Sequence, residues 1–214
     1  MKKGLTELVF ILDKSGSMCG LEADTIGGFN SMLQKQKAIE GECRITTVLF
    51  DNNYELLHDR IDIQAVSPIT EKEYQVGGST ALLDAIGRTI NKIKNAQKHT
   101  AEEYRAEKVM FVIITDGEEN SSREYSVEHI RKMIEQQKTH HGWEFIFLGA
   151  NIDAVETAVH IGISPDRAQN YHADSEGIGL SYCAMSSAIA HFREADTLPE
   201  DWKDEIQKDY KRRL

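Results

Sequence analysis

The sequence predicts an α/β fold: a doubly wound, mostly parallel sheet with helices on both faces and one antiparallel strand at an edge. Short apolar runs alternate along the chain with longer segments that carry apolar residues at helical spacing. Strands joined by connections of that length form right-handed crossovers, which place parallel neighbours in one sheet and cover both of its faces. A three-residue connection, DNN at 51–53, separates two strand-like runs and predicts the single antiparallel pair.

The first half of the chain contains three predicted strands and two predicted helices. Residues 7–12 (ELVFIL) predict a buried strand. Residues 21–40 carry apolar side chains at helical spacing and predict a helix, although two adjacent glycines weaken it. Residues 43–50 (CRITTVLF) are rich in β-branched residues and predict a strand, and the partial alternation of 54–63 predicts its antiparallel partner. Residues 77–97 predict a helix that the chain enters through a Gly-Gly loop.

The second half continues the alternation of strands and helices. Residues 108–115 (KVMFVIIT) form the most apolar run in the chain and predict a central strand. An amphipathic helix is predicted over 126–138, a buried strand over 143–150 and a short helix over 152–162. Residues 168–173 predict a short edge strand, which completes the expected sheet.

The end of the chain differs in character from the rest. Residues 176–195 predict a long helix, and we expect one domain over 1–195 followed by an amphipathic helical extension over 196–214. Thr197 and Pro199 predict the start of that helix. Its apolar stripe favours docking onto its own domain, and a helix that binds a partner is the alternative. The stripe consists of Leu198, Trp202, Ile206 and Tyr210.

Composition and charge exclude several classes of function. The chain of 214 residues has 35 acidic and 25 basic side chains, so its net charge of -10 argues against nucleic-acid binding. Three widely spaced cysteines without a C-x-x-C motif argue against a disulfide framework or a thiolate zinc site, and favour a reducing compartment. No run approaches the about 20 apolar residues of a membrane span, and the start MKKGLTELVFIL lacks a signal-peptide cleavage site. We therefore expect a cytoplasmic protein.

Three loops at one edge of the predicted sheet carry polar side chains. They are DKSGS at 13–17, GGST at 77–80 and TDGEEN at 115–120. In doubly wound sheets, ligands bind beyond the carboxyl ends of the strands, where these loops are expected to meet. The loops therefore hold the candidate functional site.

The candidate ligands in these loops all present oxygen, which suits Mg²⁺, Mn²⁺ or Ca²⁺ and argues against zinc or copper. Two carboxylates and three hydroxyls are too sparse to enclose a divalent ion. An open coordination position would remain, which a carboxylate from a partner could fill, and nearby helix N-termini would favour that anion. The five candidates are Asp13, Ser15, Ser17, Thr80 and Asp116.

The segments DKSGS, GGSTALLDAI and ITDGEEN resemble the von Willebrand factor type A (VWA) domain with an intact metal-ion-dependent adhesion site, or MIDAS. The resemblance covers about residues 5–195 and implies a six-stranded, Rossmann-like doubly wound sheet. It implies that the three hydroxyl side chains bind the metal directly, and that the two aspartates bind it directly or through water. The implied ion is Mg²⁺ first, with Mn²⁺ or Ca²⁺ as alternatives, and the implied partner is a protein that offers a carboxylate.

Each candidate also has a local explanation when it is taken alone. Ser15, Ser17 or Thr80 could cap a following helix, and Asp116 could serve a turn. The occurrence of all five on the expected elements favours the metal site over these explanations.

Five other acidic or histidine side chains are expected to lie outside the site. Glu118 and Glu119 are expected to form a solvated acidic rim, and Asp84 to support the first turn of its helix through the macrodipole. His140 and His141 lie at a helix end without a third ligand nearby in the sequence, so we do not expect them to bind metal.

Three classes of function are compatible with these residues. The first is a metal-dependent protein-interaction module, which we favour. The second is a Mg²⁺-dependent phosphotransferase-like enzyme with Asp13 as nucleophile, but such enzymes need an acid two residues later, where this chain has Ser15. The third is a scaffold whose metal is purely structural. We expect no enzymatic activity.

Overall fold

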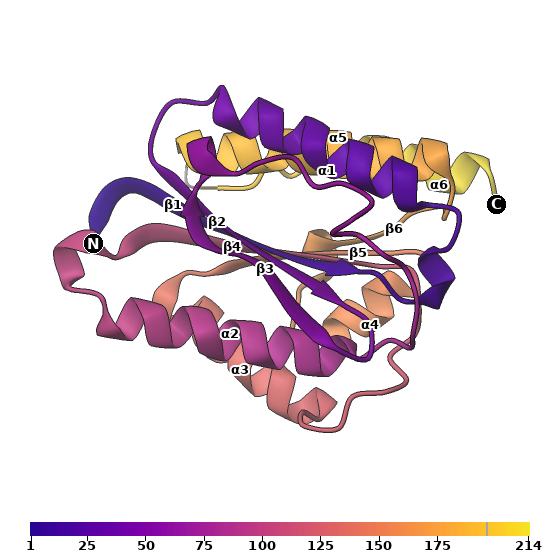
Figure 1. Ribbon diagram of the computed structural model, residues 1–214, viewed down its shortest axis with the longest axis horizontal. Coiled ribbons are helices and arrows are strands. Elements are labelled where there is room, and N and C mark those ends of the chain that lie inside the picture. The colour runs from indigo at the N-terminus through magenta and orange to yellow at the C-terminus, as the bar shows by residue number, and fades with distance from the viewer. Residues whose placement is uncertain (196) are drawn as a thin grey trace.

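A six-stranded sheet separates two layers of helices in the computed structural model, which describes residues 1–195 and 197–214 (Figure 1). The strand order is β3-β2-β1-β4-β5-β6, and all neighbours are parallel except the β2–β3 pair at one edge. This confirms the predicted fold class. The strands are β1 (Lys2–Asp13), β2 (Cys43–Phe50), β3 (Tyr54–Asp62), β4 (Ala106–Thr115), β5 (Glu144–Gly149) and β6 (Ala168–Asn170).

The helices cover both faces of the sheet. In Figure 1, α1, α5 and α6 lie above the sheet, and α2, α3 and α4 lie below it. The helices are α1 (Glu22–Lys37), α2 (Leu82–His99), α3 (Val127–His141), α4 (Ala154–His160), α5 (Ser175–Ala195) and α6 (Asp204–Arg212).

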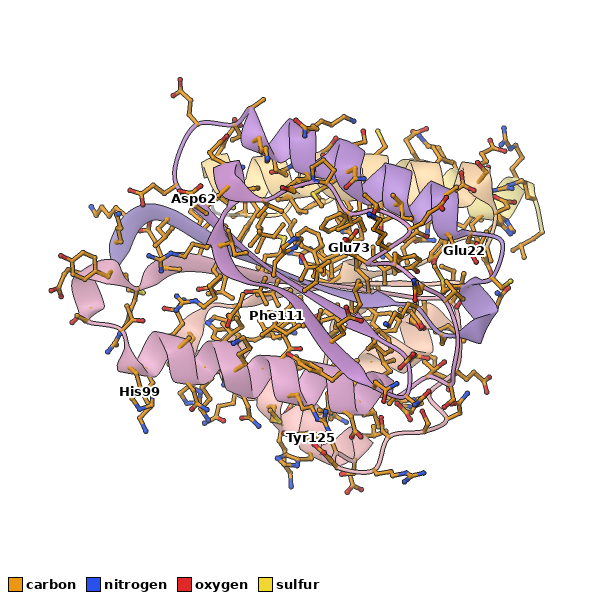
Figure 2. The ribbon with its side chains drawn as sticks, viewed as in Figure 1. Glu22, Asp62, Glu73, His99, Phe111 and Tyr125 are labelled. Carbon is orange, nitrogen blue, oxygen red and sulfur yellow. The ribbon has the colours of Figure 1, made fainter. Side chains whose placement is uncertain are left out.

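Alternating side chains of the central strands pack into two separate hydrophobic cores, one on each face of the sheet. On β1, Phe10 packs in the core beneath α1 and α5, whereas Val9 and Ile11 pack in the core that faces α2 and α3. Phe111 on β4 also faces α2 and α3, and Figure 2 labels it between the sheet and those helices. Because both faces are buried, the strands are apolar at consecutive positions, which is the pattern that made them visible in the sequence.

Strand β1 begins five residues earlier than predicted. Lys2 pairs with Ala106 before a register shift, and Gly4 within that shift has a positive φ of 74°. A glycine tolerates that conformation, so the strand continues through an irregularity that the polar sequence MKKGLT did not suggest.

A buried ion pair joins β1 to the antiparallel edge. Glu7 is 0% exposed, and its carboxylate accepts hydrogen bonds from Arg60 Nε at 2.5 Å and from Arg60 Nη2 at 3.0 Å. Gln97 on α2 donates a third bond to Glu7 at 2.9 Å. Arg60 sits at a positive φ of 51° within a shifted stretch of the β2–β3 register. The charge on β1 is therefore compensated by a residue that lies in the irregular part of β3.

The C-terminal segment docks on its own domain. Leu198, Trp202 and Ile206 are buried in the core beneath α1 and α5, and the ring of Tyr210 stacks on His172. The helix start predicted at Thr197 is wrong, because α6 begins only at Asp204.

The preceding residues, 200–203, form a turn, and three hydrogen bonds from two of its side chains tie it to the rest of the domain. Trp202 Nε1 donates to Asp166 O at 2.9 Å, and Lys203 Nζ donates to Pro165 O and Ala168 O. The predicted boundary between residues 195 and 196 stays a prediction, and residue 196 lies outside the described residues.

Both ends of helix α5 are tied to the rest of the domain. At its start, Arg213 pairs with Asp174 and Arg212 pairs with Glu176. At its end, Lys108 Nζ on β4 donates to the carbonyl of Arg193 at 2.6 Å. The Arg193 guanidinium, which is buried, donates to carbonyls at the end of α1 and in the turn after it, those of Gln36, Ile39 and Gly41.

Two adjacent glycines on α1 are expected to respond in opposite ways to alanine. A Cβ at Gly28 would lie 2.3 Å from the Tyr182 ring, so Gly28→Ala is expected to cost about 1–3 kcal/mol of stability. A Cβ at Gly27 meets nothing within 4 Å, so Gly27→Ala is expected to gain about 0.5–1 kcal/mol through helix propensity. Urea unfolding of both variants measures the difference, and equal effects would contradict the close packing of α1 on Tyr182.

Candidate metal centre

The five predicted ligands come together at the carboxyl edge of the sheet. Asp13 ends β1 and is 1% exposed, and Ser15 in the following loop is also buried. Asp116 follows directly after β4, the parallel neighbour of β1, so the two aspartates leave adjacent strands at the same edge. Thr80 lies in the loop that leads into α2. The topology therefore places all three loops around one point.

Hydrogen bonds connect the first loop to the third. Ser17 Oγ donates to Asp116 Oδ1 at 2.6 Å, and Ser15 Oγ lies 3.0 Å from Ser17 Oγ. Asp13 accepts a bond from the Ser15 backbone at 2.7 Å and one from Thr115 Oγ1 at 2.5 Å. Four of the five predicted ligands thus form a continuous polar cluster.

Thr80 reaches the same cluster from the second loop. A Cβ placed on Gly117 would lie 3.1 Å from Ser17 Oγ and 3.2 Å from Thr80 Oγ1, so both hydroxyls converge above this glycine. Asn120 fixes the Thr80 backbone, because its Oδ1 accepts from Thr80 N at 2.9 Å and its own backbone N–H donates to Thr80 O at 3.0 Å. Any side chain at Gly117 would fill the space between the hydroxyls.

Backbone hydrogen bonds hold the first two loops against each other. Gly16 N donates to Gly78 O at 3.0 Å, and Gly77 N donates to Lys14 O at 2.9 Å. Gly78 has a positive φ of 76°, which explains why a glycine stands at this position. The loops are therefore positioned by their own backbone contacts.

The two carboxylates lie in an environment that disfavours their charge. Burial raises the pKa of Asp13, even though its hydrogen bonds act in the opposite direction. Burial also raises the pKa of Asp116, and the nearby negative charge of Asp13 raises it further. Asp116 Oδ2 is buried and has no hydrogen-bond partner among the residues that the structure describes. A cation placed against this oxygen would offset both the repulsion and the missing bond, so the donor set fits a bound divalent ion.

A family comparison identifies the domain. The profile of the von Willebrand factor type A domain matches residues 7–180. The chain belongs to this family. The match runs from β1 into α5, and α6 lies beyond it. A search of the curated proteins finds no match.

Solved structures share the VWA fold at low sequence identity. A von Willebrand factor type A protein from Catenulispora acidiphila is 13% identical, with a TM-score of 0.57 over 86% of this chain and 42% of that chain. Manganese-loaded TRAP protein from Plasmodium vivax is 20% identical, with a TM-score of 0.59 over 84% of this chain and 72% of that one. Proximal thread matrix protein 1 from the mussel byssus, with a zinc-occupied MIDAS motif, is 14% identical, with a TM-score of 0.58 over 86% of this chain and 46% of that chain. This VWA chain therefore spans less than half of the Catenulispora and mussel proteins.

The expected acidic rim is only partly present in the VWA domain. Glu118 is exposed, as expected, but the prediction is wrong for Glu119. Its carboxylate accepts from Leu83 N at 2.9 Å, in the first turn of α2, and from Ser121 N and Ser122 N at 2.9 and 2.7 Å. Glu119 therefore fastens the third loop to the helix that follows Thr80.

Asp84 also has a role that the sequence did not indicate. Its carboxylate accepts from the backbone N–H groups of Arg123, Glu124 and Tyr125 at 2.9–3.0 Å. Asp84 lies in the first turn of α2, where its charge is also favourable to the helix dipole. It holds the end of the third loop through these backbone contacts.

Sequence reasoning missed three residues that position the centre: Thr115, Gly117 and Asn120. All three lie in the polar TDGEEN segment at 115–120. Their roles depend on residues far away in the chain, since Thr115 and Asp13 are 102 positions apart and Asn120 and Thr80 are 40 apart. The polar character of the segment was the only signal that could have indicated them.

Other metal-binding groups, reactive thiols and membrane-spanning helices also bear on what the VWA domain can do. Within residues 1–195 and 197–214, no three His, Cys, Asp or Glu side chains form a metal-binding group, so a centre here depends on hydroxyls as well as acids. Cys43 is buried, which raises its pKa to about 12, while Cys19 and Cys183 are exposed free thiols. No helix in the described part of the chain has the length and apolar character to cross a bilayer.

Proposed function

We propose that this VWA domain is a non-enzymatic protein-interaction module that binds a divalent cation and, through it, a carboxylate of a protein partner. The observation that supports this most is the buried Oδ2 of Asp116, which has no hydrogen-bond partner among the described residues, while Oδ1 of the same carboxylate accepts from Ser17 Oγ at 2.6 Å. A buried carboxylate oxygen without a donor is costly, and a hard cation is the group that best satisfies it. Mg²⁺ is our first choice, with Mn²⁺ or Ca²⁺ as alternatives.

The residues of the chain have separate roles in this proposal. Ser15, Ser17 and Thr80 supply neutral oxygen, and Asp13 and Asp116 supply charge. When bound, the cation supplies a positive centre with an open coordination position. Two carboxylates balance the charge of a divalent ion but do not fill its coordination sphere, so a position remains that a carboxylate of the partner would occupy.

Enzymatic activity is not part of this proposal. A nucleophilic Asp13 would need a proton donor near position 15, and Ser15 instead shares a hydroxyl contact with Ser17 at 3.0 Å. The exposed thiols favour a reducing compartment, and we place the module in the cytoplasm. Its acidic net charge favours a protein partner over nucleic acid.

A capture experiment with matched variants tests this function. The immobilised domain is exposed to source lysate with Mg²⁺ or with EDTA, and the eluted proteins are compared by mass spectrometry. We expect partners that require both Mg²⁺ and Asp116, and that persist in Glu118→Gln, which neutralises an exposed acid on the same loop. Partners whose capture is unchanged by EDTA and by Asp116→Asn would contradict the metal-bridged function. A cation-induced rise in melting temperature without such partners would favour the structural scaffold instead.

Cation affinity is expected to fall as the pH is lowered, beginning above the ordinary pKa of an aspartate. Burial raises the pKa of Asp13 and Asp116, so protons compete for these carboxylates at less acidic pH. Without cation, the same shifts stabilise the native state most at low pH, and this stability is lost as the pH rises past the unfolded pKa. Titrating Mn²⁺ between about pH 7.5 and pH 4.5 measures the effect. A constant affinity across that range would contradict the assignment.

A further inference from the structure

A cavity lies at the end of the sheet opposite the candidate metal centre. It has a volume of about 530 Å³ and lies between the C-terminal ends of α2 and α3, beside the start of β4. Strand β4 runs from this cavity to Asp116, and its ten residues separate the two sites by roughly 30 Å. In Figure 2, His99 marks this end of α2, and Tyr125 marks the end near the metal centre. The cavity is therefore independent of the metal ligands.

One buried polar side chain in this cavity lacks a partner. Gln137 on α3 lines the cavity and is 1% exposed, and its Oε1 is buried without a hydrogen bond to any described residue. Trp143 lies beside it, is 5% exposed, and stacks on Phe111 with ring centroids 5.4 Å apart. Buried amide oxygens are nearly always paired, so this unpaired oxygen, on a side chain that lines the cavity, is a group that a ligand with a hydrogen-bond donor would satisfy.

The mouth of the cavity carries uncommitted positive charge. Lys94 and Lys98 line it, and neither makes an ion pair or side-chain hydrogen bond in the described part of the chain. The two acids on the same wall are engaged, because Glu107 accepts from Gly4 N at 2.6 Å and Glu102 lies 3.9 Å from the N-terminal amine. A favourable position at the C-terminal dipole of α2 explains Lys98, but Lys94 lies a full turn earlier. The chain as a whole has a net charge of -10, so these two lysines form a local positive patch on an otherwise acidic protein.

We infer that this cavity binds a small organic anion with a planar body that bears a hydrogen-bond donor. The planar body would occupy the apolar part of the cavity against Trp143, and its donor would pair with Gln137 Oε1. Its phosphate or carboxylate would reach Lys94 and Lys98 at the mouth. The volume lies within the range of small-molecule sites, which combine apolar walls with a few placed polar groups.

Two anions with their uncharged relatives test this inference. Adenosine 5′-monophosphate and indole-3-acetate serve as the phosphate and carboxylate probes, and adenosine and indole as the neutral ones. Each is titrated into ¹⁵N-labelled full chain while amide and Gln side-chain resonances are followed. We expect at least one anion to shift resonances around Gln137 and Trp143, with a weaker response from its neutral relative. No shift at the cavity from either anion, or equal responses from the neutral compounds, would overturn the inference.

Variants separate recognition from folding. Gln137→Leu is expected to weaken anion binding about tenfold or more without lowering the melting temperature, because the amide oxygen makes no bond within the described part of the chain. Lys94→Gln with Lys98→Gln is expected to weaken binding and reduce its salt dependence, and this pair serves if Gln137→Leu does not fold. Lys132→Gln, an exposed lysine on α3 away from the cavity, is expected to bind normally. Unchanged affinity in the cavity variants would overturn the inference.

Discussion

Asp116→Asn is expected to abolish the rise in melting temperature that divalent cations produce, while leaving the cation-free domain at least as stable as the wild type. Burial and the charge of Asp13 raise the pKa of Asp116, so its ionised form is unfavourable in the folded, cation-free protein. The carboxamide keeps an oxygen for the bond from Ser17 and removes the repulsion. It also removes half of the negative charge that would hold the ion.

The size of this effect makes it measurable by thermal unfolding. A cation at about 100 times its dissociation constant stabilises the wild type by about 2.7 kcal/mol, which corresponds to a shift of roughly 5–10 °C for a chain of this size. Glu118→Gln, two residues away and exposed, is the matched control and should keep the full shift. A full cation response in Asp116→Asn would exclude Asp116 as a ligand. A marked loss of stability in Asp116→Asn without cation would show that the ionised carboxylate is not unfavourable in the folded protein.

Arg60→Ala is expected to destabilise the domain by about 3 kcal/mol or more. Among the described residues, it would leave the Glu7 carboxylate, which is 0% exposed, with only the bond from Gln97. An uncompensated buried charge costs about 3–5 kcal/mol, and we expect the lower part of that range because the Arg60 side chain is 17% exposed.

Urea unfolding with two further variants checks the cause. Lys92→Ala, which breaks the exposed pair with Asp59, is expected to cost less than about 1 kcal/mol. The double change Glu7→Leu with Arg60→Met is expected to recover most of the lost stability, because it removes both charges together. If the double variant were as unstable as Arg60→Ala, the loss would come from the strand geometry around Arg60.

The sheet and the cluster of candidate ligands could be predicted because their signals are local. The run KVMFVIIT stands out as β4 because both of its faces are buried, and DKSGS stands out because a strand rarely ends in an acid followed by alternating hydroxyls. Parallel topology then places the loops after β1 and β4 at the same edge. Local sequence pattern and sheet topology were therefore sufficient to predict which loops form the candidate site.

The features that could not be predicted depend on distant partners. The sequence places Glu119 in a solvated rim and Asp84 in the first turn of a helix. In the structure, each accepts hydrogen bonds from backbone groups about 40 positions away, and Glu119 also accepts local ones. The late start of α6 depends on Trp202 and Lys203 reaching the turn at 165–168. None of these contacts alters the spacing of apolar residues along the chain, so the sequence pattern does not indicate them.

The fastening of helix α5 at both ends has a mechanical consequence. Sliding this helix by one turn, about 5.4 Å, would have to break the ion pairs of Arg212 and Arg213 and the carbonyl contacts of Lys108 and Arg193 at once. These contacts lie at opposite ends of the helix, so no single local rearrangement releases it. Helix α5 is therefore held at both ends, and a shift along its axis would require both sets of contacts to break together.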